Sequence, residues 1–398
     1  MPISTNTFLL IITLITIHVA DNNQPLSGVS TVVETPHIDF IEMSAVQPHE
    51  SNPDVIWYDD FRLEKAYLES SGKIDYEVKF GITGGSMEAG FEKDMIEGKG
   101  NRKVAFGDFP SNRNVLRAGE HFDEIYWRIY VKHEYGWEGA PAKMSRATSI
   151  VSARSWRQAM IAHVWSGEGN SLTLDPVRGV DEQSAKVKTQ HYNDFKNFHW
   201  LGNSPCSEFQ ISSTEESGYW VLVESMVRLN TPGKNDGLNR LWIDGRLEAE
   251  RTNLNLRGTY TEHGINAVFL EAYWNDGAIK TENRWFDNFV ISTQAIGPVV
   301  CPANPVIHKT PYHGRDSLSA WEIELATDYS GNSIVFQSKE IRPQEAIKIA
   351  SENGTFSGML QKKSKLTSGE TYFCRVRQKN YNNIWSDWSR WHQPFTVE

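Results

Sequence analysis

The stretch that decides the fold reads EIYWRIYVKH at residues 124–133 and QAMIAHVWSG at residues 158–167. Apolar and polar side chains alternate in both segments, which is the period of a β-strand. One face of the first segment carries only polar or aromatic side chains: Tyr126, Arg128, Tyr130 and Lys132. In the second segment Ile161, His163 and Trp165 share a face. We therefore expect two strands, each with one face that does not belong to an ordinary apolar core.

A group of cations lies in the connection between the two segments. Lys143, Arg146, Arg154 and Arg157 follow one another with no acidic residue among them. A strand face of tyrosine and cations suits a polar, anionic ligand better than a core, so we expect Arg128, Tyr130 and Arg146 to contact the ligand. The predicted ligand is an acidic saccharide.

The composition limits the classes of function. The chain has 398 residues, which is long enough for two domains with cores of their own. Its formal net charge of −10 argues against a nucleic-acid binder and makes a local cluster of cations more informative. Fourteen Trp and fourteen Tyr suit both β structure and surfaces on which sugars stack.

The N-terminal segment resembles an export signal. Phe8–Ala20 is an apolar run too short to span a bilayer comfortably, and it fits the central region of a secretory signal. We expect residues 1–20 to be a signal peptide, residues 21–53 to be a flexible leader, and the protein to be secreted, extracellular or periplasmic. No other segment is apolar enough to cross a membrane, so no membrane span is expected.

Residues 54–298 read as many short strands separated by turns, with no sustained helical period. Asp244-Gly245 after the strand-like LNRLWI is a strong hairpin signal. The predicted fold class is all-β, a two-sheet jelly-roll β-sandwich.

Residues 299–398 form a second, smaller domain. Thr371–Arg377 after Leu366-Thr-Ser-Gly resembles the tyrosine corner and following strand of a fibronectin type III domain, and Trp385-Ser-Asp-Trp388-Ser resembles the tryptophan box of cytokine-receptor domains of that type. We interpret this box as a stacked ladder of Trp and Arg side chains that stiffens one sheet. The three cysteines form no metal pattern, and a Cys301–Cys374 bridge stays open.

The first domain resembles the β-jelly-roll polysaccharide lyases, the group that includes alginate and glucuronan lyases. The stretches that carry the resemblance are EIYWRIYV at 124–131, Ser152-Ala-Arg154, WVLVESMVRLNTPGKNDGLNRLWIDGRL at 220–247 and RWFDNFVIST at 284–293. The resemblance implies β-elimination on a uronic-acid polymer. That reaction needs a cation to neutralise the C6 carboxylate, a base to take the C5 proton, and an acid to protonate the leaving oxygen.

The resemblance also implies roles for individual residues. Lys143 matches the lysine of the family after its glycine-rich turn and would serve as base or carboxylate contact. Ser152 and Arg154 match a Ser-x-Arg pair in which the arginine holds the carboxylate. His163 and Trp165 stand where the family has Tyr-x-Tyr, so the tyrosine acid is missing there.

Other residues would have to replace that acid. His163 suits acid or base work because the pKa of histidine lies near neutrality, and Tyr192 or Tyr130 would supply a phenol. Gln158 is a further candidate to bind a carboxylate or hydroxyl.

A metal site is a separate hypothesis. Asp59 and Asp60 end the first predicted strand, and Asp287-Asn288 begins the last. If these strands pair, Asp60 and Asp287 meet and their hard oxygen ligands suit a structural Ca²⁺. The alternative is a hydrogen-bonded strand end without an ion, and we expect no other cofactor.

Three alternatives to the lyase remain open. Tyr273 and Trp274 form a predicted sugar-stacking rim, which suits a non-catalytic carbohydrate-binding protein as well. Glu224 and Glu271 would be the paired carboxylates of a glycoside hydrolase. An adhesion protein with two binding domains is the third alternative.

Overall fold

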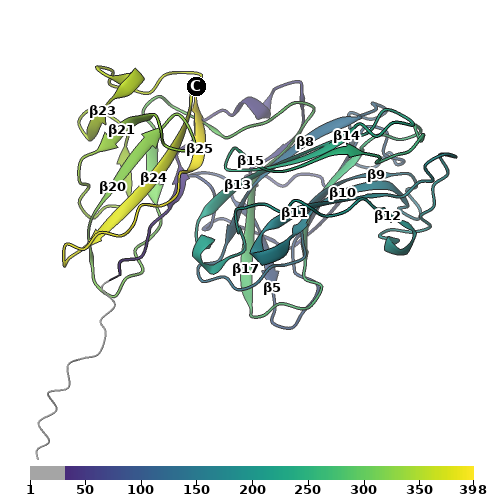
Figure 1. Cartoon of the computed structure of the whole chain (residues 1–398), viewed down its shortest axis with the longest axis horizontal. Coiled ribbons are helices and arrows are strands. Elements are labelled where there is room, and N and C mark those ends of the chain that lie inside the picture. Colours follow the sequence, from purple (N-terminus) through teal and green to yellow (C-terminus); the bar gives the residue numbers. More distant parts are fainter. Residues whose placement is uncertain (1–31) are drawn as a thin grey trace, which may run out of the picture. The chain divides into compact units, whose positions relative to one another are not determined.

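The computed structural model describes residues 32–398. The predicted signal peptide and the first part of the predicted leader lie outside the described residues. The described chain is all-β, as predicted, and is built of sheets that are antiparallel except for the pairs β6–β7 and β18–β25 (Figure 1). Its helical segments are single 3-10 turns: η1 (Pro48–Glu50), η2 (Glu168–Asn170), η3 (Phe195–Asn197), η4 (Thr214–Glu216) and η5 (Gly358–Leu360). Within residues 32–398, no helix has the length and apolarity needed to cross a membrane.

The first sandwich consists of two stacked eight-stranded sheets, which we call the front and back sheets. The front sheet has the order β12-β11-β10-β9-β16-β6-β3, with β7 beside β6. Its strands are β3 (Glu69–Ser71), β6 (Asn101–Phe106), β7 (Val115–Leu116), β9 (Lys143–Ile150), β10 (Gln158–Ser166), β11 (Leu172–Arg178), β12 (His199–Trp200) and β16 (Ala267–Tyr273). The two segments that opened the sequence analysis are therefore in different sheets, because residues 124–133 form β8 of the back sheet.

The back sheet has the order β15-β14-β13-β8-β17-β5-β4, with β2 beside β17. Its strands are β2 (Val55–Asp59), β4 (Lys73–Asp75), β5 (Ser86–Phe91), β8 (Glu124–His133), β13 (Trp220–Arg228), β14 (Gly237–Ile243), β15 (Arg246–Leu254) and β17 (Glu282–Ser292). The predicted hairpin turn joins β14 to β15, where Asp244 and Gly245 have φ values of 47° and 76°. A left-handed pair of this kind favours Asp-Gly.

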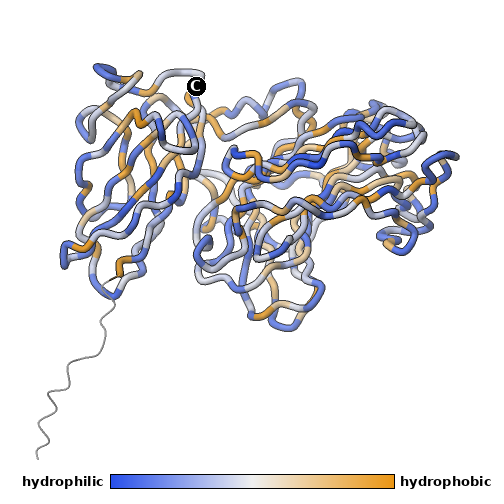
Figure 2. Tube along the Cα trace, in the orientation of Figure 1, coloured by the Kyte–Doolittle hydropathy of each residue, from blue (hydrophilic) through white to orange (hydrophobic). Residues whose placement is uncertain are grey.

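The core between the two sheets is made by the alternate side chains of the central strands. Trp127 and Ile129 of β8 and Met160 and Val164 of β10 are almost completely buried in one apolar cluster. Along the tube of Figure 2 the apolar residues gather in the strands, while many connecting loops are hydrophilic. Burial of this apolar surface, at about 25 cal/mol per Å², is the main force that holds the sheets together.

The second sandwich pairs a six-stranded sheet, β18-β25-β24-β20-β21-β23, with a three-stranded sheet, β1-β19-β22. Its strands are β1 (Ile38–Ile41), β18 (Val300–Cys301), β19 (Val306–Lys309), β20 (Leu318–Ala326), β21 (Ile334–Ser338), β22 (Ala346–Lys348), β23 (Gly354–Phe356), β24 (Thr371–Asn380) and β25 (His392–Val397). The Tyr372 hydroxyl accepts a hydrogen bond from the Thr367 N–H at 3.0 Å, and Arg377 lies between the rings of Trp385 and Trp388 at 4.4 and 4.6 Å. Membership of the fibronectin type III class stays a prediction.

Residues 33–53 are not the flexible leader that the sequence analysis predicted. The IDFI segment of β1 pairs with β19, and Ile38 and Ile41 are completely buried in the core of the second sandwich. Gln47 adds two hydrogen bonds of 2.9 Å to the backbone of Val300. Two isoleucines three residues apart are enough to dock this segment, although the polar and proline-containing surroundings hide the signal.

The two sandwiches share one apolar cluster. Tyr130 and Trp220 of the back sheet pack in the same cluster as Trp321 and Val376 of the second sandwich. Cys301 and Cys374 also lie in this cluster as free thiols, so the structure contains no bridge between them. The outer face of the back sheet is therefore covered.

A buried histidine attaches β1 to the rest of the second sandwich. His392 Nε2 accepts a hydrogen bond from the Ile38 N–H at 2.8 Å, and its Nδ1–H donates to the Arg390 carbonyl at 2.8 Å. Burial, with smaller contributions from Arg390 and His37, lowers the pKa of His392 well below 6.5. The ring is thus neutral, and protonation would remove the acceptor for Ile38.

We expect His392→Gln to flatten the acid dependence of stability. Below pH 6.5 the unfolded histidine binds a proton that the folded one does not. Each decrease of one pH unit should therefore lower the free energy of unfolding of the wild type by up to about 1.4 kcal/mol more than that of the variant. Urea unfolding at several pH values between 7 and 5 measures this difference. His199→Gln removes an exposed imidazole and should keep the wild-type slope; equal slopes in all three proteins would contradict the assignment.

Candidate functional site

The candidate site lies on the outer face of the front sheet. Arg146 of β9 is paired with His163 of β10 and with Phe269 of β16. Nearer the start of β9, Lys143 is paired with Trp165 of β10 and Tyr273 of β16. Because Met160, Ala162 and Val164 point into the core, Ile161, His163 and Trp165 point outward, as the alternation predicted. Three neighbouring strands therefore bring cations and aromatic rings together.

Lys143 is held among aromatic rings. Its side chain is 7% exposed, and Nζ lies 4.1 Å from the ring centroid of Tyr273, 5.6 Å from that of Phe195 and 5.8 Å from that of Trp165. No hydrogen bond or ion pair of Nζ is found within residues 32–398. Burial is the largest influence on the pKa of Lys143 and lowers it. The carboxylate of Glu271 raises this pKa and the charge of Arg146 lowers it, and the net effect is a lowered pKa.

Arg146 is completely buried and fixed on several sides. Its guanidinium donates to Glu271 at 2.7 Å and to Asn193 Oδ1 at 2.7 Å, and it contacts the Tyr192 hydroxyl. Burial raises the pKa of Tyr192 far above 10, although Arg146 acts in the opposite direction. The phenol therefore keeps its proton and is a potential donor. The second oxygen of Glu271, Oε2, is buried and has no hydrogen-bond partner among the described residues.

Gln158 supports the loop that carries Tyr192. Gln158 is completely buried; its Oε1 accepts from the Asn193 N–H at 2.9 Å and its Nε2 donates to Thr148 at 3.1 Å. The structure thus places Gln158 beneath the site, where it positions Asn193 and Tyr192, rather than at the surface where it was expected to bind ligand.

His163 lies at the centre of the predicted cluster but below its surface. The ring is completely buried, 3.8 Å from the Trp165 ring, and Nδ1 lies 2.8 Å from the Asp175 carbonyl. Burial, followed by the charge of Arg146, lowers its pKa well below 6.5. The Nδ1–H donates to the carbonyl, so Nε2 is an unprotonated acceptor, and none of residues 32–398 donates to it. This arrangement gives His163 no proton to donate, contrary to the predicted acid role.

Arg284 of β17 reaches the site from the opposite sheet. Its guanidinium donates to the backbone carbonyls of Lys143 at 2.9 Å and Glu271 at 2.8 Å. The side chain is 1% exposed, it has no carboxylate partner among the described residues, and burial lowers its pKa to about 9. The two carbonyls lie where β9 and β16 lose their regular register. Arg284 therefore satisfies backbone groups that the sheet leaves free.

Ser152 and Arg154, the pair predicted to hold the substrate carboxylate, lie at the far end of β9. Arg154 is exposed in the turn between β9 and β10, and Ser152 accepts hydrogen bonds from Ser155 within that turn. A strand advances about 3.3 Å per residue, so Lys143 and Ile150 are about 23 Å apart and Arg154 lies beyond Ile150. The structure does not bring Arg154 or Ser152 to Lys143.

Arg128 and Tyr130 are not part of this face either. Both are completely buried on the covered outer face of the back sheet. Arg128 donates to the Gly297 carbonyl at 2.9 Å, and the Tyr130 hydroxyl accepts from the Val299 N–H at 3.2 Å. These side chains attach the segment that leads into the second sandwich.

Of the two residues of the predicted sugar-stacking rim, Tyr273 lies in the site and Trp274 lies in the core. Tyr273 lies against Lys143, as described above. Trp274 is 5% exposed and packs with Trp137 and Phe91 inside the first sandwich. A regular alternation would have placed one of the two residues on each face, so their expected joint exposure was wrong.

The predicted calcium ligands are occupied by protein groups. Asp60 pairs with Arg62 at 2.6 Å, and Asp287 accepts from the backbone N–H groups of Phe80 and Asn288 at 2.7 and 2.6 Å. Within the described part of the chain, no group of three or more His, Cys, Asp or Glu side chains is arranged to hold a metal ion. Calcium binding stays an untested prediction.

The two carboxylates of the hydrolase alternative lie on different sheets. Glu224 is on β13 of the back sheet and accepts from the N–H groups of Ile296 and Gly297 at 2.9 Å each. Glu271 is on the outer face of the front sheet. Stacked sheets are about 10 Å apart, and both side chains point away from the core, so their separation exceeds the roughly 5–9.5 Å of a glycosidase pair. The structure does not support this pair.

Aromatic residues of the loop before β12 complete the site, and sequence reasoning gave them no role in it. Phe195 lies beside Trp165 and Trp200, with ring centroids 6.1 and 5.8 Å away, and Trp200 is 41% exposed. The aromatic residues of FKNFHW at 195–200 were a visible signal of such a surface.

Comparisons with known proteins were made by sequence and by structure. No protein-family model matches the chain, and no curated protein matches it. The structure is similar to an endo-β-1,4-glucuronan lyase from the fungus Trichoderma reesei (TM-score 0.42, 15% identity, 60% of this chain and 95% of that one). It is also similar to an alginate lyase from a Chlorella virus (0.40, 14%, 59% and 93%) and to one from Aplysia kurodai (0.39, 14%, 60% and 99%).

These likenesses are too weak to transfer an activity. The identities are those of chains that share at most a fold. The function is therefore inferred from the side chains of the site itself.

We expect Arg284→Met to be strongly destabilising although it removes a buried charge. The substitution leaves two buried carbonyls without donors, at about 1–3 kcal/mol each, so the free energy of unfolding should fall by about 2–6 kcal/mol. Urea unfolding measures it. Arg240→Met, which removes a partly exposed arginine from β14, is the matched control and should cost less than about 1 kcal/mol. Equal losses in the two variants would contradict the role assigned to Arg284.

Proposed function

We propose that this protein is an exported polysaccharide lyase that cleaves a uronic-acid polymer by β-elimination at the outer face of the front sheet. The observation that carries the proposal is Lys143: a buried amine with a lowered pKa, set among aromatic rings and without a hydrogen-bond partner in the described part of the chain. Export is supported by the signal-like run Phe8–Ala20.

The site offers groups for each demand of β-elimination. Lys143 takes the C5 proton, because a lowered pKa makes the free amine more available near neutral pH. Tyr192, whose phenol keeps its proton, donates to the leaving glycosidic oxygen. The positive charge of Arg146, fixed beside Tyr192, favours the charge that builds up on the uronate as the proton leaves.

The aromatic rings around Lys143 support a saccharide as the substrate. Tyr273, Trp165 and Phe195 lie against the amine, and Trp200 extends this aromatic group beside Trp165. Aromatic faces pack against the C–H faces of sugars, while the cations favour an acidic sugar over a neutral one.

The reaction is tested by absorbance. β-Elimination creates an unsaturated uronide that absorbs in the near ultraviolet, so a panel of alginate, glucuronan, ulvan and heparinoids should include a polymer on which absorbance rises. Lys143→Ala should lower the rate by about 10²–10⁴, the usual contribution of a general base. Lys143→Arg keeps the positive charge but cannot accept a proton near neutrality, and it should be equally impaired.

The two variants separate two roles. If Lys143→Arg retained activity while Lys143→Ala did not, Lys143 would act as a carboxylate contact and not as the base. Activity in both variants would refute the site. Arg154→Ala, which changes the exposed cation at the far end of β9, is the control and should behave as wild type.

The pH profile should depend on Glu271. As a base, Lys143 must lose its proton, so activity should rise with pH towards a pKa below 10.5. Because the carboxylate of Glu271 raises that pKa, Glu271→Gln should move the profile to lower pH. Glu97→Gln removes a weaker influence of the same sign without touching Arg146, and it should move the profile less. A profile that moves to higher pH in Glu271→Gln would contradict the base role.

A carbohydrate-binding protein without activity is the second candidate. The observation that favours it is the ion pair between Arg146 and Glu271, which neutralises one cation of the site internally. Calorimetric binding of a uronic-acid oligosaccharide, lost in Lys143→Ala and accompanied by no absorbance change for the whole panel, would establish this function instead.

A further inference from the structure

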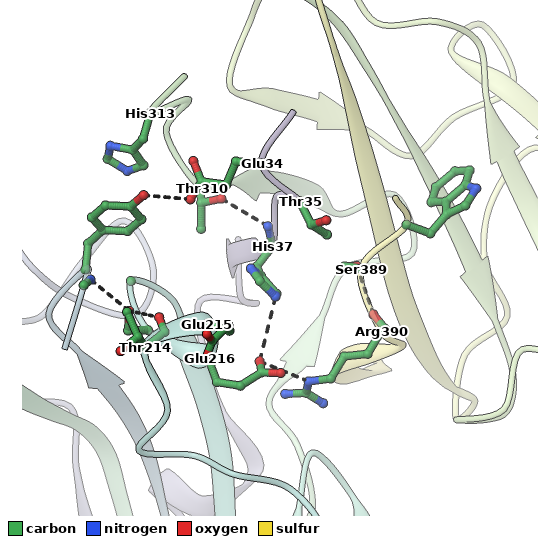
Figure 3. A pocket seen from close by; sticks show the side chains of 15 residues that line it. Glu34, Thr35, His37, Thr214, Glu215, Glu216, Thr310, His313, Ser389 and Arg390 are labelled. Atoms are coloured by element: carbon green, nitrogen blue, oxygen red, sulfur yellow. Dashed lines mark hydrogen bonds and ion pairs between the residues drawn. The ribbon is translucent and has the colours of Figure 1, made fainter. Parts of the chain in front are cut away.

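A second pocket lies away from the front sheet, where three parts of the chain meet. It has a volume of about 520 Å³. Its walls come from the residues before β1, from the loops that follow β8 and contain η4, and from the loops before β25 and after β19 (Figure 3). Neither the proposed reaction nor the aromatic face around Lys143 uses these residues.

The pocket has an excess of negative charge. Glu34, Glu215 and Glu216 line it, against one guanidinium, that of Arg390. Arg390 is committed to Asp244, to which it donates at 2.6 Å, and it lies 3.7 Å from Glu216. Its charge is therefore already balanced by these two carboxylates.

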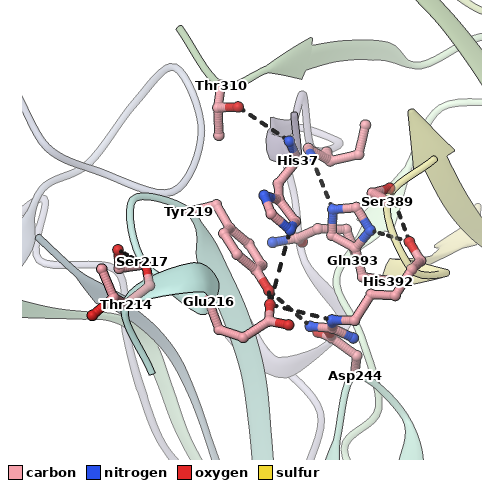
Figure 4. Close-up of polar contacts among 12 residues, drawn as sticks. His37, Thr214, Glu216, Ser217, Tyr219, Asp244, Thr310, Ser389, His392 and Gln393 are labelled. Carbon is pink, nitrogen blue, oxygen red and sulfur yellow. Dashed lines mark hydrogen bonds and ion pairs between the residues drawn. The ribbon is translucent and has the colours of Figure 1, made fainter. Parts of the chain in front are cut away.

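Glu216 is likewise engaged by the protein. Its carboxylate contacts the Tyr219 hydroxyl, and His37 Nε2 lies 3.9 Å away (Figure 4). His37 adds no compensating charge, because burial, followed by Arg390, lowers its pKa to about 3.

The two other carboxylates that line the pocket belong to Glu34 and Glu215. Glu34 accepts only a neutral hydrogen bond, from the Tyr135 hydroxyl at 2.9 Å, and no hydrogen bond or ion pair of the Glu215 carboxylate is found within residues 32–398. Figure 3 shows Glu34 on one side of His37 and the Glu215–Glu216 pair on the other. The pocket thus places two carboxylates without an ion-pair partner among residues 32–398 on different walls. The buried ammonium of Lys309 donates to the Thr310 carbonyl at 2.8 Å and acts on Glu34 only at longer range.

The remaining wall is aromatic. The rings of Tyr135 and His313 stack 4.0 Å apart, and the His37 ring stacks on Tyr219 at 4.0 Å. These rings form a rigid surface for an apolar stem, while the carboxylates require a positive head.

We infer that this pocket binds an aliphatic ammonium group. An anionic saccharide is excluded by the carboxylates, so the pocket is not an extension of the proposed lyase site. A metal ion does not fit, because no group of three His, Cys, Asp or Glu side chains within residues 32–398 is arranged as ligands. An ammonium with a short alkyl stem meets both the charge and the aromatic wall. Its source is a free amine or the lysine side chain of a peptide.

Titration calorimetry at low salt with the full chain tests the inference. The probes are pentylammonium and, as its uncharged counterpart, 1-pentanol. We expect pentylammonium to bind and pentanol to bind at least tenfold more weakly. Glu34→Gln and Glu215→Gln should each weaken pentylammonium binding at least about tenfold, the loss expected for one charged hydrogen bond. Glu370→Gln, an exposed glutamate of the second sandwich outside this pocket, is the matched control and should not change binding.

Each result of these titrations either supports or overturns the inference. Glu215 is exposed, so its variant should fold normally and report on binding even if Glu34→Gln disturbs the segment before β1. No binding of pentylammonium, equal binding of pentanol, or unchanged affinity in Glu215→Gln overturns the inference. With binding established, putrescine and Nα-acetyl-lysine methylamide distinguish the sources, since tighter binding of the first indicates a free amine and of the second a peptide side chain.

Discussion

The guanidinium of Arg284 joins the core of the first sandwich to its candidate site. It starts on β17 of the back sheet, crosses the core between Phe91 and Phe286, and ends on the carbonyls of Lys143 and Glu271 in the front sheet. A charge in this position is costly to bury. It persists because the front sheet loses its regular register at those two residues and leaves carbonyls that only a buried donor can reach.

The same irregularity explains the position of Lys143. A regular strand would continue the strict alternation of β9, in which Arg146 faces outward and Ala147 faces the core. The shift in register near Lys143 lets its side chain turn outward beside Tyr273. Trp127 supplies a second bond between the sheets, donating from Nε1 to Ser145 at 3.0 Å. The geometry of the site therefore depends on polar contacts that run through the core, and not only on residues at the surface.

Much of the fold could be predicted because alternation is a local property. The strands of residues 124–133 and 158–167, the Asp244-Gly245 hairpin and the all-β class all follow from short patterns. What the patterns do not contain is which outer face stays open. Arg128 and Tyr130 have the alternation of a ligand-binding face, yet the segment around Gly297 and the second sandwich cover them.

The site was predicted in part for a similar reason. Lys143, Arg146, His163 and Tyr192 come together because β9 and β10 are neighbours and the loop before β12 folds over them. Arg154 is only eleven positions after Lys143, but an extended strand turns closeness in sequence into distance in space. The partners that fix the electrostatics, Glu271 and Arg284, come from strands more than a hundred residues away. No local pattern could have linked them to Lys143.

The polar side chains on the two outer faces of the first sandwich therefore bond to different partners. On the back sheet, Arg128, Tyr130 and Glu224 all bond to the backbone of residues 288–299, so that polar side chains hold the connection to the second sandwich. On the front sheet, the corresponding polar side chains are tied to one another and to the loop of Asn193, and no hydrogen bond or ion pair of Lys143 Nζ is found among residues 32–398. Both faces hold a buried polar atom without a partner among these residues, Glu271 Oε2 on the front sheet and Arg128 Nε on the back sheet, so unpaired atoms do not distinguish the two faces. What distinguishes the front sheet is that the second sandwich packs on the back sheet instead, while the aromatic group beside Lys143 includes Trp200, which is 41% exposed.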